Sequence, residues 1–170
     1  MPDPKGPLPV YSEQLPTVQD TEAFGRRLAD GLAAGDVVLV SGPLGAGKTA
    51  LARGIAAGLG VQGTVSSPTF IIAREHRAGA SRPGGLAPVA LVHADLYRLV
   101  GDAERAHDAH LALDELDALD LDTELEDAVL VVEWGEGLVE RLVDRYLWVR
   151  LDRDREDETR VARWEWVDGA

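Results

Sequence analysis

The sequence predicts an α/β fold in which a largely parallel central sheet is flanked by helices and carries a C-terminal antiparallel hairpin. Val37–Val40 is a continuous run rich in β-branched residues, as expected of a strand that is buried on both faces. Apolar residues recur at helical spacing over Lys48–Gly58, so a helix is expected there. Two apolar runs flank the charged turn Asp152–Glu158, which is typical of a hairpin. Strands that alternate with helices indicate a layered fold with mainly parallel pairing.

The remaining elements follow from spacing and from turn residues. A helix is expected over Thr21–Ala34, with Asp20 or Thr21 as its N-cap and Gly35 as its stop signal. The glycine- and proline-rich stretch Arg77–Pro88 is interpreted as a mobile loop. Strands are expected at Val37–Val40, Phe70–Ala73, Val89–His93, Val129–Val132, Tyr146–Leu151 and Arg160–Val167.

Length and composition fit one domain. The chain has 170 residues, of which 45% are hydrophobic and 28% charged, as in ordinary globular domains. A proline-rich leader with a short edge strand is expected over residues 1–19, and a single domain over residues 20–170. No apolar run approaches the roughly 20 residues needed to cross a bilayer, and no signal segment is recognisable, so we expect a cytoplasmic protein without membrane partners. The absence of cysteine excludes disulfides and thiolate metal ligands.

The charge of the chain is strongly acidic and is concentrated in one segment. Seventeen basic and thirty acidic side chains give a net charge of −13, and residues 101–127 hold eleven of the acids and one base. An acidic protein is poorly suited to grip nucleic acid directly, because that requires a basic face. The acidic segment is either a solvated surface or a docking surface for a basic partner, and the sequence leaves both open.

Residues 42–49 (Gly-Pro-Leu-Gly-Ala-Gly-Lys-Thr) match the phosphate-loop pattern G-x-x-x-x-G-K-[ST] without a mismatch. The three glycines, Gly42, Gly45 and Gly47, allow the backbone to form a nest whose N–H groups point at phosphate oxygens. Lys48 is expected to reach the β- and γ-phosphates, and the Thr49 hydroxyl to bind Mg²⁺. A strand precedes the loop and a helix follows it, which is the context that the motif requires. The sequence therefore predicts a P-loop NTPase-like fold.

Two acids follow other predicted strands and are candidates to complete the site. Asp95 follows the strand at 89–93, and Glu133 directly follows Val129–Val132. The carboxyl ends of parallel strands meet at one edge of a sheet, where ligands bind. Glu133 is the better candidate for the Mg²⁺ position, with Asp95 positioning or activating water, but the reverse assignment is also open.

A third candidate lies in Ser66-Ser67-Pro68-Thr69. A hydroxyl here either senses the γ-phosphate or belongs to a turn built by serine and proline, and the residues alone do not decide.

Several classes of nucleotide-using protein remain after these observations. A GTPase is disfavoured because the chain has no asparagine for a guanine-reading Asn-Lys-x-Asp motif. A small-molecule kinase needs an arginine-rich lid, for which only Arg74–Arg82 offers three arginines. The other open classes are an ATPase that drives a partner and a non-enzymatic module that binds its partner when nucleotide is present.

Four ordered blocks together resemble one family. They are Gly-Pro-Leu-Gly-Ala-Gly-Lys-Thr (42–49), Ser-Ser-Pro-Thr-Phe (66–70), His-Ala-Asp-Leu-Tyr-Arg-Leu (93–99) and Val-Val-Glu-Trp (131–134). They are similar to those of the TsaE (YjeE-type) family, over about residues 10–167. The resemblance implies a cytoplasmic P-loop ATPase of tRNA threonylcarbamoyladenosine biosynthesis, which works with TsaB and TsaD. It also implies that the protein reaches tRNA only through that complex.

The resemblance also implies roles for particular residues. It places ATP phosphates on Leu44, Gly45, Ala46, Gly47, Lys48 and Thr49, and Mg²⁺ on Thr49 and Glu133. It gives Asp95 a role in hydrolysis and Thr69 a switch-like role. The helix around Thr21 is expected to border the adenine, and Arg160 to approach the nucleotide. Two departures from the family pattern, Pro43 and Gly135, remove no phosphate or metal ligand.

Overall fold

The structure is a computed structural model and describes residues 10–43, 45–63, 73–96, 125–137, 139–153, 157 and 159–168. Its helices are α1 (Val18–Ala29), α2 (Lys48–Leu59) and α5 (Val139–Leu142), with short 3-10 turns η1 (Pro83–Gly85) and η3 (Leu125–Asp127). Its strands are β1 (Tyr11–Leu15), β2 (Val37–Ser41), β3 (Ala73–His76), β4 (Ala90–Asp95), β5 (Ala128–Glu133), β6 (Arg145–Asp152) and β7 (Arg160–Asp168). None of the described helices is long and apolar enough to cross a membrane.

The strands form one seven-stranded sheet in the order β1-β7-β6-β2-β5-β4-β3. The four central strands β6, β2, β5 and β4 are parallel to one another. β7 pairs antiparallel with β6 and with β1, and β3 pairs antiparallel with β4 at the other edge. The predicted α/β class, the largely parallel sheet and the C-terminal antiparallel hairpin are therefore confirmed.

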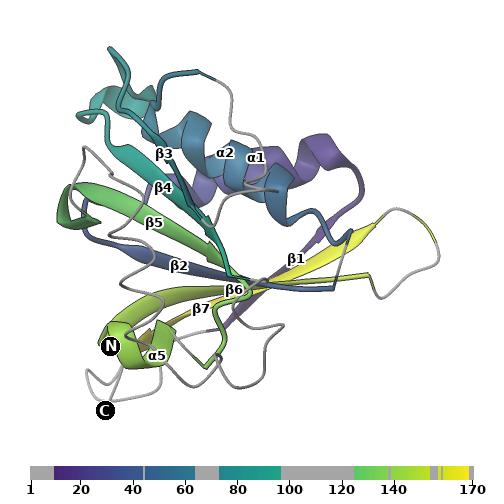
Figure 1. The fold of residues 1–170 in the computed structure, drawn as a ribbon. Coiled ribbons are helices and arrows are strands. Elements are labelled where there is room, and N and C mark those ends of the chain that lie inside the picture. The colour runs from purple at the N-terminus through teal and green to yellow at the C-terminus, as the bar shows by residue number, and fades with distance from the viewer. Residues whose placement is uncertain are drawn as a thin grey trace, which may run out of the picture.

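The two long helices lie on the same face of the sheet, and α5 lies on the opposite side (Figure 1). Strand side chains on the face of the sheet that α1 and α2 cover, such as those of Val38 and Val131, join Leu51 and Ile55 in one buried core. Strand side chains on the opposite face of the sheet form a second core, which includes Val139 of α5. Because side chains alternate along a strand, only every second residue of each strand points to the face that α2 covers.

Glycines bring α1 and α2 into close contact. A Cβ atom added to Gly25 would lie 2.5 Å from the Leu51 carbonyl oxygen, and one added to Gly54 would overlap the backbone of Glu22. A Cβ added to Gly58 would lie 2.5 Å from Cβ of Ala29. Later residues of α1 thus contact later residues of α2, so the helices run in the same direction. Their N-termini lie side by side at one end of the sheet.

The boundaries predicted for the first helix are wrong. α1 begins after Thr17, whose side chain accepts from the Asp20 N–H at 3.2 Å, while the Asp20 carboxylate accepts from the Thr17 N–H at 2.9 Å. This capping box satisfies two backbone donors, so it starts the helix earlier than the predicted caps would. The helix ends at Ala29, with Asp30 as its C-cap. The predicted caps Asp20 and Thr21 and the predicted stop at Gly35 are therefore corrected.

The segment Arg77–Pro88, predicted to be a mobile loop, is anchored to the helices. Arg82 is only 7% exposed, and its guanidinium donates to the carbonyl oxygens of Ala29 (2.7 Å) and Leu32 (3.0 Å). The Gly79 N–H also donates to the Gly60 carbonyl at 2.7 Å. Arg82 thus stabilises the carbonyl end of α1 in place of the predicted glycine.

The remaining strands lie within two residues of their predicted positions, apart from β3. The strand predicted at Phe70–Ala73 lies outside the described residues except for Ala73, and β3 continues from there to His76. Its polar residues Arg74 and Glu75 concealed this continuation, which the antiparallel pairing with β4 supports.

Candidate phosphate-binding site

The glycine-rich loop connects the end of β2 to the start of α2, at the edge where the parallel strands end. Gly45 and Gly47 have φ angles of 79° and 97°, in the left-handed region that favours glycine. A Cβ on Gly42 would lie 2.5 Å from the Leu151 carbonyl oxygen, so β6 leaves no space for a side chain there. Gly47 is the N-cap of α2, so free N–H groups and the positive end of the helix dipole face the loop. This arrangement suits an anion.

Lys48, the first residue of α2, is buried with 7% exposure. Its Nζ donates to the Gly42 carbonyl oxygen at 2.7 Å and lies 4.1 Å from the centroid of the Trp134 ring. Trp134 has a φ of 59°, an uncommon conformation for a residue with a side chain. The Gly42 carbonyl and the Trp134 ring together hold the ammonium group beside the glycine-rich loop.

Asp95 and Glu133 end the neighbouring strands β4 and β5 and are directly paired in register. By strand alternation, both lie on the face of the sheet that α2 covers, at the same edge as the loop. Burial lowers the pKa of Lys48 from 10.5, while the negative charges of Glu133, Asp95 and Glu136 act in the opposite direction. The lysine therefore lies in the field of three acids.

The donor set fits a magnesium ion. Two carboxylates and the half-buried Thr49 hydroxyl supply hard oxygen ligands, the kind that Mg²⁺ prefers. No group of three or more His, Cys, Asp or Glu that could hold a metal occurs in the described ranges. Mg²⁺ at phosphate sites commonly uses one or two carboxylates, with phosphate oxygens and water completing its shell.

His93 contacts Glu133 beneath this site. Its Nε2 lies 2.6 Å from Glu133 Oε2, with His93 fully buried and Glu133 4% exposed. The Leu96 N–H donates to the Glu133 carbonyl at 3.0 Å, which continues the link between β4 and β5 beyond Asp95. Glu133 is thus held through both its backbone and its side chain.

A second polar network ties the segment after β5 to the base of the loop. The Ser41 hydroxyl contacts the Glu136 carboxylate and accepts from Trp148 Nε1 at 2.8 Å. Ser41 directly precedes Gly42, so Glu136 is joined to the strand that carries the phosphate loop.

The other predicted site residues fall into two groups. Thr21 is buried, and its Cγ2 lies 3.7 Å from where a Cβ on Gly47 would be, so α1 borders the loop. The Arg160 guanidinium donates to the Gly45 carbonyl at 3.2 Å. Leu44 and Thr69 lie outside the described residues.

Sequence reasoning did not single out Glu136, and it quoted His93 and Trp134 in the resemblance blocks without predicting their contacts with Glu133 and Lys48. His93 lies two residues before Asp95 on the same strand, so strand alternation alone would have placed both on one face. The proximity of Trp134 and Glu136 to Lys48 depends on how the chain turns after β5, for which the sequence carries no signal.

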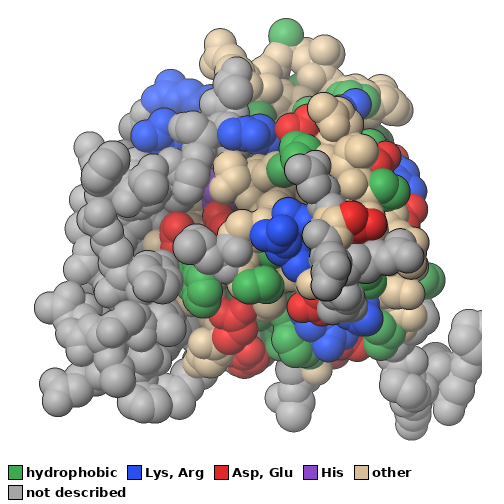
Figure 2. Space-filling view, turned by 90° about the vertical axis from the view of Figure 1, so that its right-hand side faces the viewer, with side chains coloured by type: hydrophobic (Ala, Val, Ile, Leu, Met, Phe, Trp, Pro, Cys, Tyr) green, Lys and Arg blue, Asp and Glu red, His purple; other side chains and the backbone are tan. Residues whose placement is uncertain are grey.

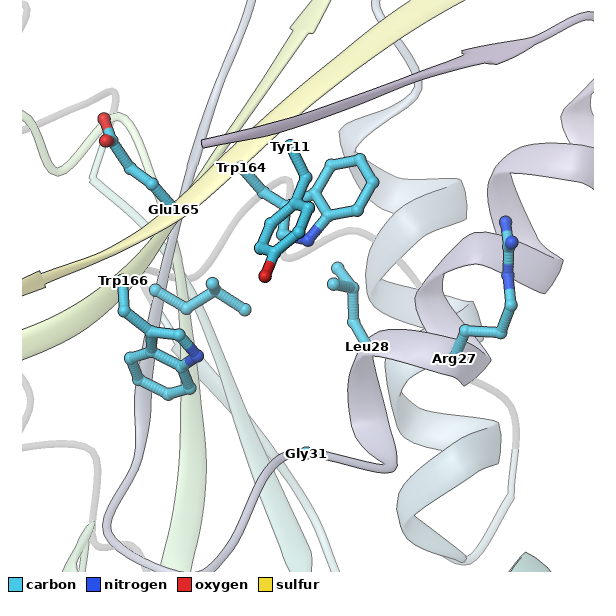
Figure 3. Close-up of a pocket in the computed structure, with 8 residues that line it drawn as sticks. Tyr11, Arg27, Leu28, Gly31, Trp164, Glu165 and Trp166 are labelled. Carbon is cyan, nitrogen blue, oxygen red and sulfur yellow. The ribbon is translucent and has the colours of Figure 1, made fainter. Parts of the chain in front are cut away.

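A cavity of about 180 Å³ lies between the end of α1 and strands β6, β7 and β1, and none of the described residues of 42–49 lines it. Tyr11 and Trp164 stack with ring centroids 5.6 Å apart, and Phe24 packs against Trp164 at 4.6 Å. Figure 3 shows Tyr11, Trp164, Trp166 and Leu28 around this space, with the ends of Arg27 and Glu165 directed away. Trp164 and Trp166 therefore pack at this edge of the sheet.

Figure 2 looks onto the side of the molecule where β2 and β6 end. Acidic and basic side chains are intermixed on the coloured part of this face. The acidic run noted in the sequence lies outside the described residues except for 125–127.

Comparisons with known proteins agree on one family. The model of the family described as "Threonylcarbamoyl adenosine biosynthesis protein TsaE" matches residues 15–162. A Mycobacterium tuberculosis protein named tRNA threonylcarbamoyladenosine biosynthesis protein TsaE is 56% identical over 152 residues, 89% of this chain and 84% of the relative. A Streptomyces coelicolor protein of the same name is 52% identical, over 81% of this chain and 84% of the relative. A crystal structure of YdiB from Bacillus subtilis matches with a TM-score of 0.62 and 25% identity, covering 96% of this chain and 89% of that one.

Proposed function

Because the chain belongs to the TsaE family of threonylcarbamoyl adenosine biosynthesis proteins, we propose that it is a Mg²⁺-dependent ATPase that supports this tRNA modification. The observation that carries the proposal is the convergence of Lys48, Glu133 and Asp95 at the phosphate loop. We further propose a cytoplasmic protein that acts with TsaB- and TsaD-like partners and reaches tRNA only through them.

Each residue has a definite task in this proposal. The N–H groups of residues 44–49 bind the phosphates, and Lys48 exchanges the Gly42 carbonyl for phosphate oxygens. Thr49 and Glu133 hold Mg²⁺, which neutralises phosphate charge when bound, and Asp95 orients water or shares the metal. Thr69 responds to the γ-phosphate, while Thr21 and Arg160 border the nucleotide.

The small-molecule kinase has less support than the ATPase. Its lid would need the arginines of 74–82, but Arg82 is buried against the end of α1 and Arg74 belongs to β3. Neither is in a loop that closes over the phosphates. The remaining alternative, a binding module gated by nucleotide, differs from the ATPase only in lacking turnover.

The test is ATP hydrolysis by the full chain, alone and with its TsaB–TsaD pair, at varied Mg²⁺. We expect Mg²⁺-dependent release of free phosphate that the partners increase, and tRNA modification that depends on ATP. Glu133→Ala should retain ATP binding and lose most turnover, whereas the control Glu165→Ala, on β7 beside Arg150, should match the wild type.

Three other results would contradict the ATPase. Phosphate transferred to an added metabolite selects the kinase, and tight binding without turnover in any complex selects the gated module. Modification of tRNA that proceeds normally without ATP hydrolysis by this protein would remove the proposed role altogether.

A further inference from the structure

The contact between the His93 and Glu133 side chains is almost completely buried. His93 has no exposed surface, and Glu133 is 4% exposed. A carboxylate buried in protein is costly unless its oxygens accept hydrogen bonds. The buried Glu133 carboxylate therefore needs a hydrogen-bond partner, and His93 supplies one.

The direction of this hydrogen bond follows from its partners. An ionised carboxylate only accepts, so the proton lies on Nε2 of His93, which donates to Glu133 Oε2 at 2.6 Å. Nδ1 of His93 has no hydrogen-bond partner among the described residues. Within the described part of the chain, the imidazole thus makes one hydrogen bond, the one to Glu133.

That contact fixes one of the two oxygens of Glu133. With Oε2 held from below by β4, rotation of the carboxylate is restricted and Oε1 is left for a ligand at the edge of the sheet. Hydrogen bonds of this kind orient metal-binding carboxylates, and their loss typically lowers metal affinity by about 10- to 100-fold.

We propose that His93 is a positioning residue that orients the Glu133 carboxylate for Mg²⁺ of the bound nucleotide. The inference rests on the proposed function, because it concerns the same site. His93 itself touches neither nucleotide nor metal in this proposal. It acts only through Glu133.

The chain contains a matched control for the loss of a buried histidine. His76 lies on β3, is 7% exposed, and its Nε2 has no hydrogen-bond partner among the described residues. His76 and His93 face the same side of the sheet, since Arg74 pairs with His93. His76 is thus nearly as buried as His93, and in the part of the chain that the structure describes it has no hydrogen bond to an acid.

The experiment measures how much Mg²⁺ is needed to bind a non-hydrolysable ATP analogue, by calorimetry, with Mn²⁺ paramagnetic resonance as a second readout. His93→Asn and His93→Gln form the critical pair, because their amide nitrogens mimic Nδ1 and Nε2 respectively. We expect His93→Asn to raise the half-saturating Mg²⁺ concentration about 10-fold, and His93→Gln to restore most of it. The control His76→Asn should match the wild type.

A double-mutant cycle separates positioning from a general structural role. In the Glu133→Ala background, His93→Asn should have no further effect on the Mg²⁺ requirement, because the group it orients is gone. An equal loss in both backgrounds, or equal behaviour of the Asn and Gln variants, would overturn the positioning role while leaving the proposed function intact. Wild-type binding of the analogue that does not depend on Mg²⁺ would overturn this inference alone, whereas wild-type ATP hydrolysis that does not depend on Mg²⁺ would overturn the proposed function, and this inference with it.

Discussion

The parallel centre of the sheet and its antiparallel edge use buried side chains for different purposes. Where β2, β4 and β5 end, the buried residues include Lys48, His93 and Glu133, all able to carry charge. Along β7 and β1, the side chains that pack together are aromatic, with Trp164 between Tyr11 and Phe24.

Strand direction explains the difference. Parallel strands place their carboxyl ends at one edge, so residues that follow three separate strands meet there, as Asp95 and Glu133 do beside the phosphate loop. In the antiparallel pairs β6–β7 and β7–β1, successive strand ends alternate between the two edges, and cross-strand side-chain pairs stabilise the sheet. We therefore expect mutations in the first region to change ligand binding and mutations in the second to change stability.

The largest expected effect is that of Lys48→Ala on nucleotide affinity. Removing the ammonium from a buried phosphate site costs about 3 kcal/mol or more, which is over 100-fold in affinity. The free energy of unfolding should not fall, because burial already lowers the pKa of Lys48 and so disfavours its charged form in the folded protein. Calorimetry with ATP and urea unfolding of the free protein measure the two quantities.

The control for this variant is Arg53→Ala on the same helix, whose side chain is 46% exposed and lies 4.0 Å from Glu22. It should change affinity by less than about twofold, since exposed ion pairs contribute little. If Lys48→Ala unfolds the protein, or leaves nucleotide affinity unchanged, the expectation that mutations in the parallel centre change binding and not stability is wrong.

The second effect is that of Trp164→Ala on stability. Truncation removes contacts with Tyr11 and Phe24 and enlarges the cavity beside α1, so we expect a loss of about 3 kcal/mol in urea unfolding. Nucleotide affinity should stay within about twofold of the wild type. Tyr11→Ala, which removes the half-exposed outer ring of the stack, should cost about 1 kcal/mol. A large drop in affinity with either variant would mean that this edge also serves the nucleotide.

The sequence allowed different amounts of prediction in the two regions. The phosphate loop was predictable because residues 42–49 match a pattern whose every fixed position has a steric or electrostatic reason. The strand ending at Glu133 was equally clear, because an apolar run of that length is typical of a buried parallel strand. The site residues Leu44 and Thr69 stay predictions, since they lie outside the described residues.

What could not be predicted depends on contacts distant in sequence. The stack of Tyr11 on Trp164 needs the pairing of the first strand with the last, which no local signal specifies. The end of α1 was misplaced because Arg82, more than fifty residues later, donates hydrogen bonds to the carbonyl groups at the end of the helix, so no glycine cap is needed there. Its start was misplaced for a local reason, because the capping box at Thr17 was overlooked.

The smallest expected effect is a pH dependence of nucleotide affinity. Burial lowers the pKa of Lys48 below the ordinary 10.5. In the proposed function, phosphate binds the charged form of the lysine. Affinity should therefore be complete at neutral pH and fall as the pH rises through the lowered pKa, by at most tenfold per pH unit. Calorimetry from about pH 8 upwards measures this slope.

Lys48→Arg tests whether Lys48 is the group responsible. A guanidinium stays charged throughout this range, so the variant should bind more weakly overall, because its geometry differs, but without the alkaline decline. The antiparallel edge supplies the matched comparison, since Trp164→Ala should keep the wild-type slope while losing stability. Equal slopes in the wild type and in Lys48→Arg would assign the titration to another group and leave Lys48 charged at every pH examined.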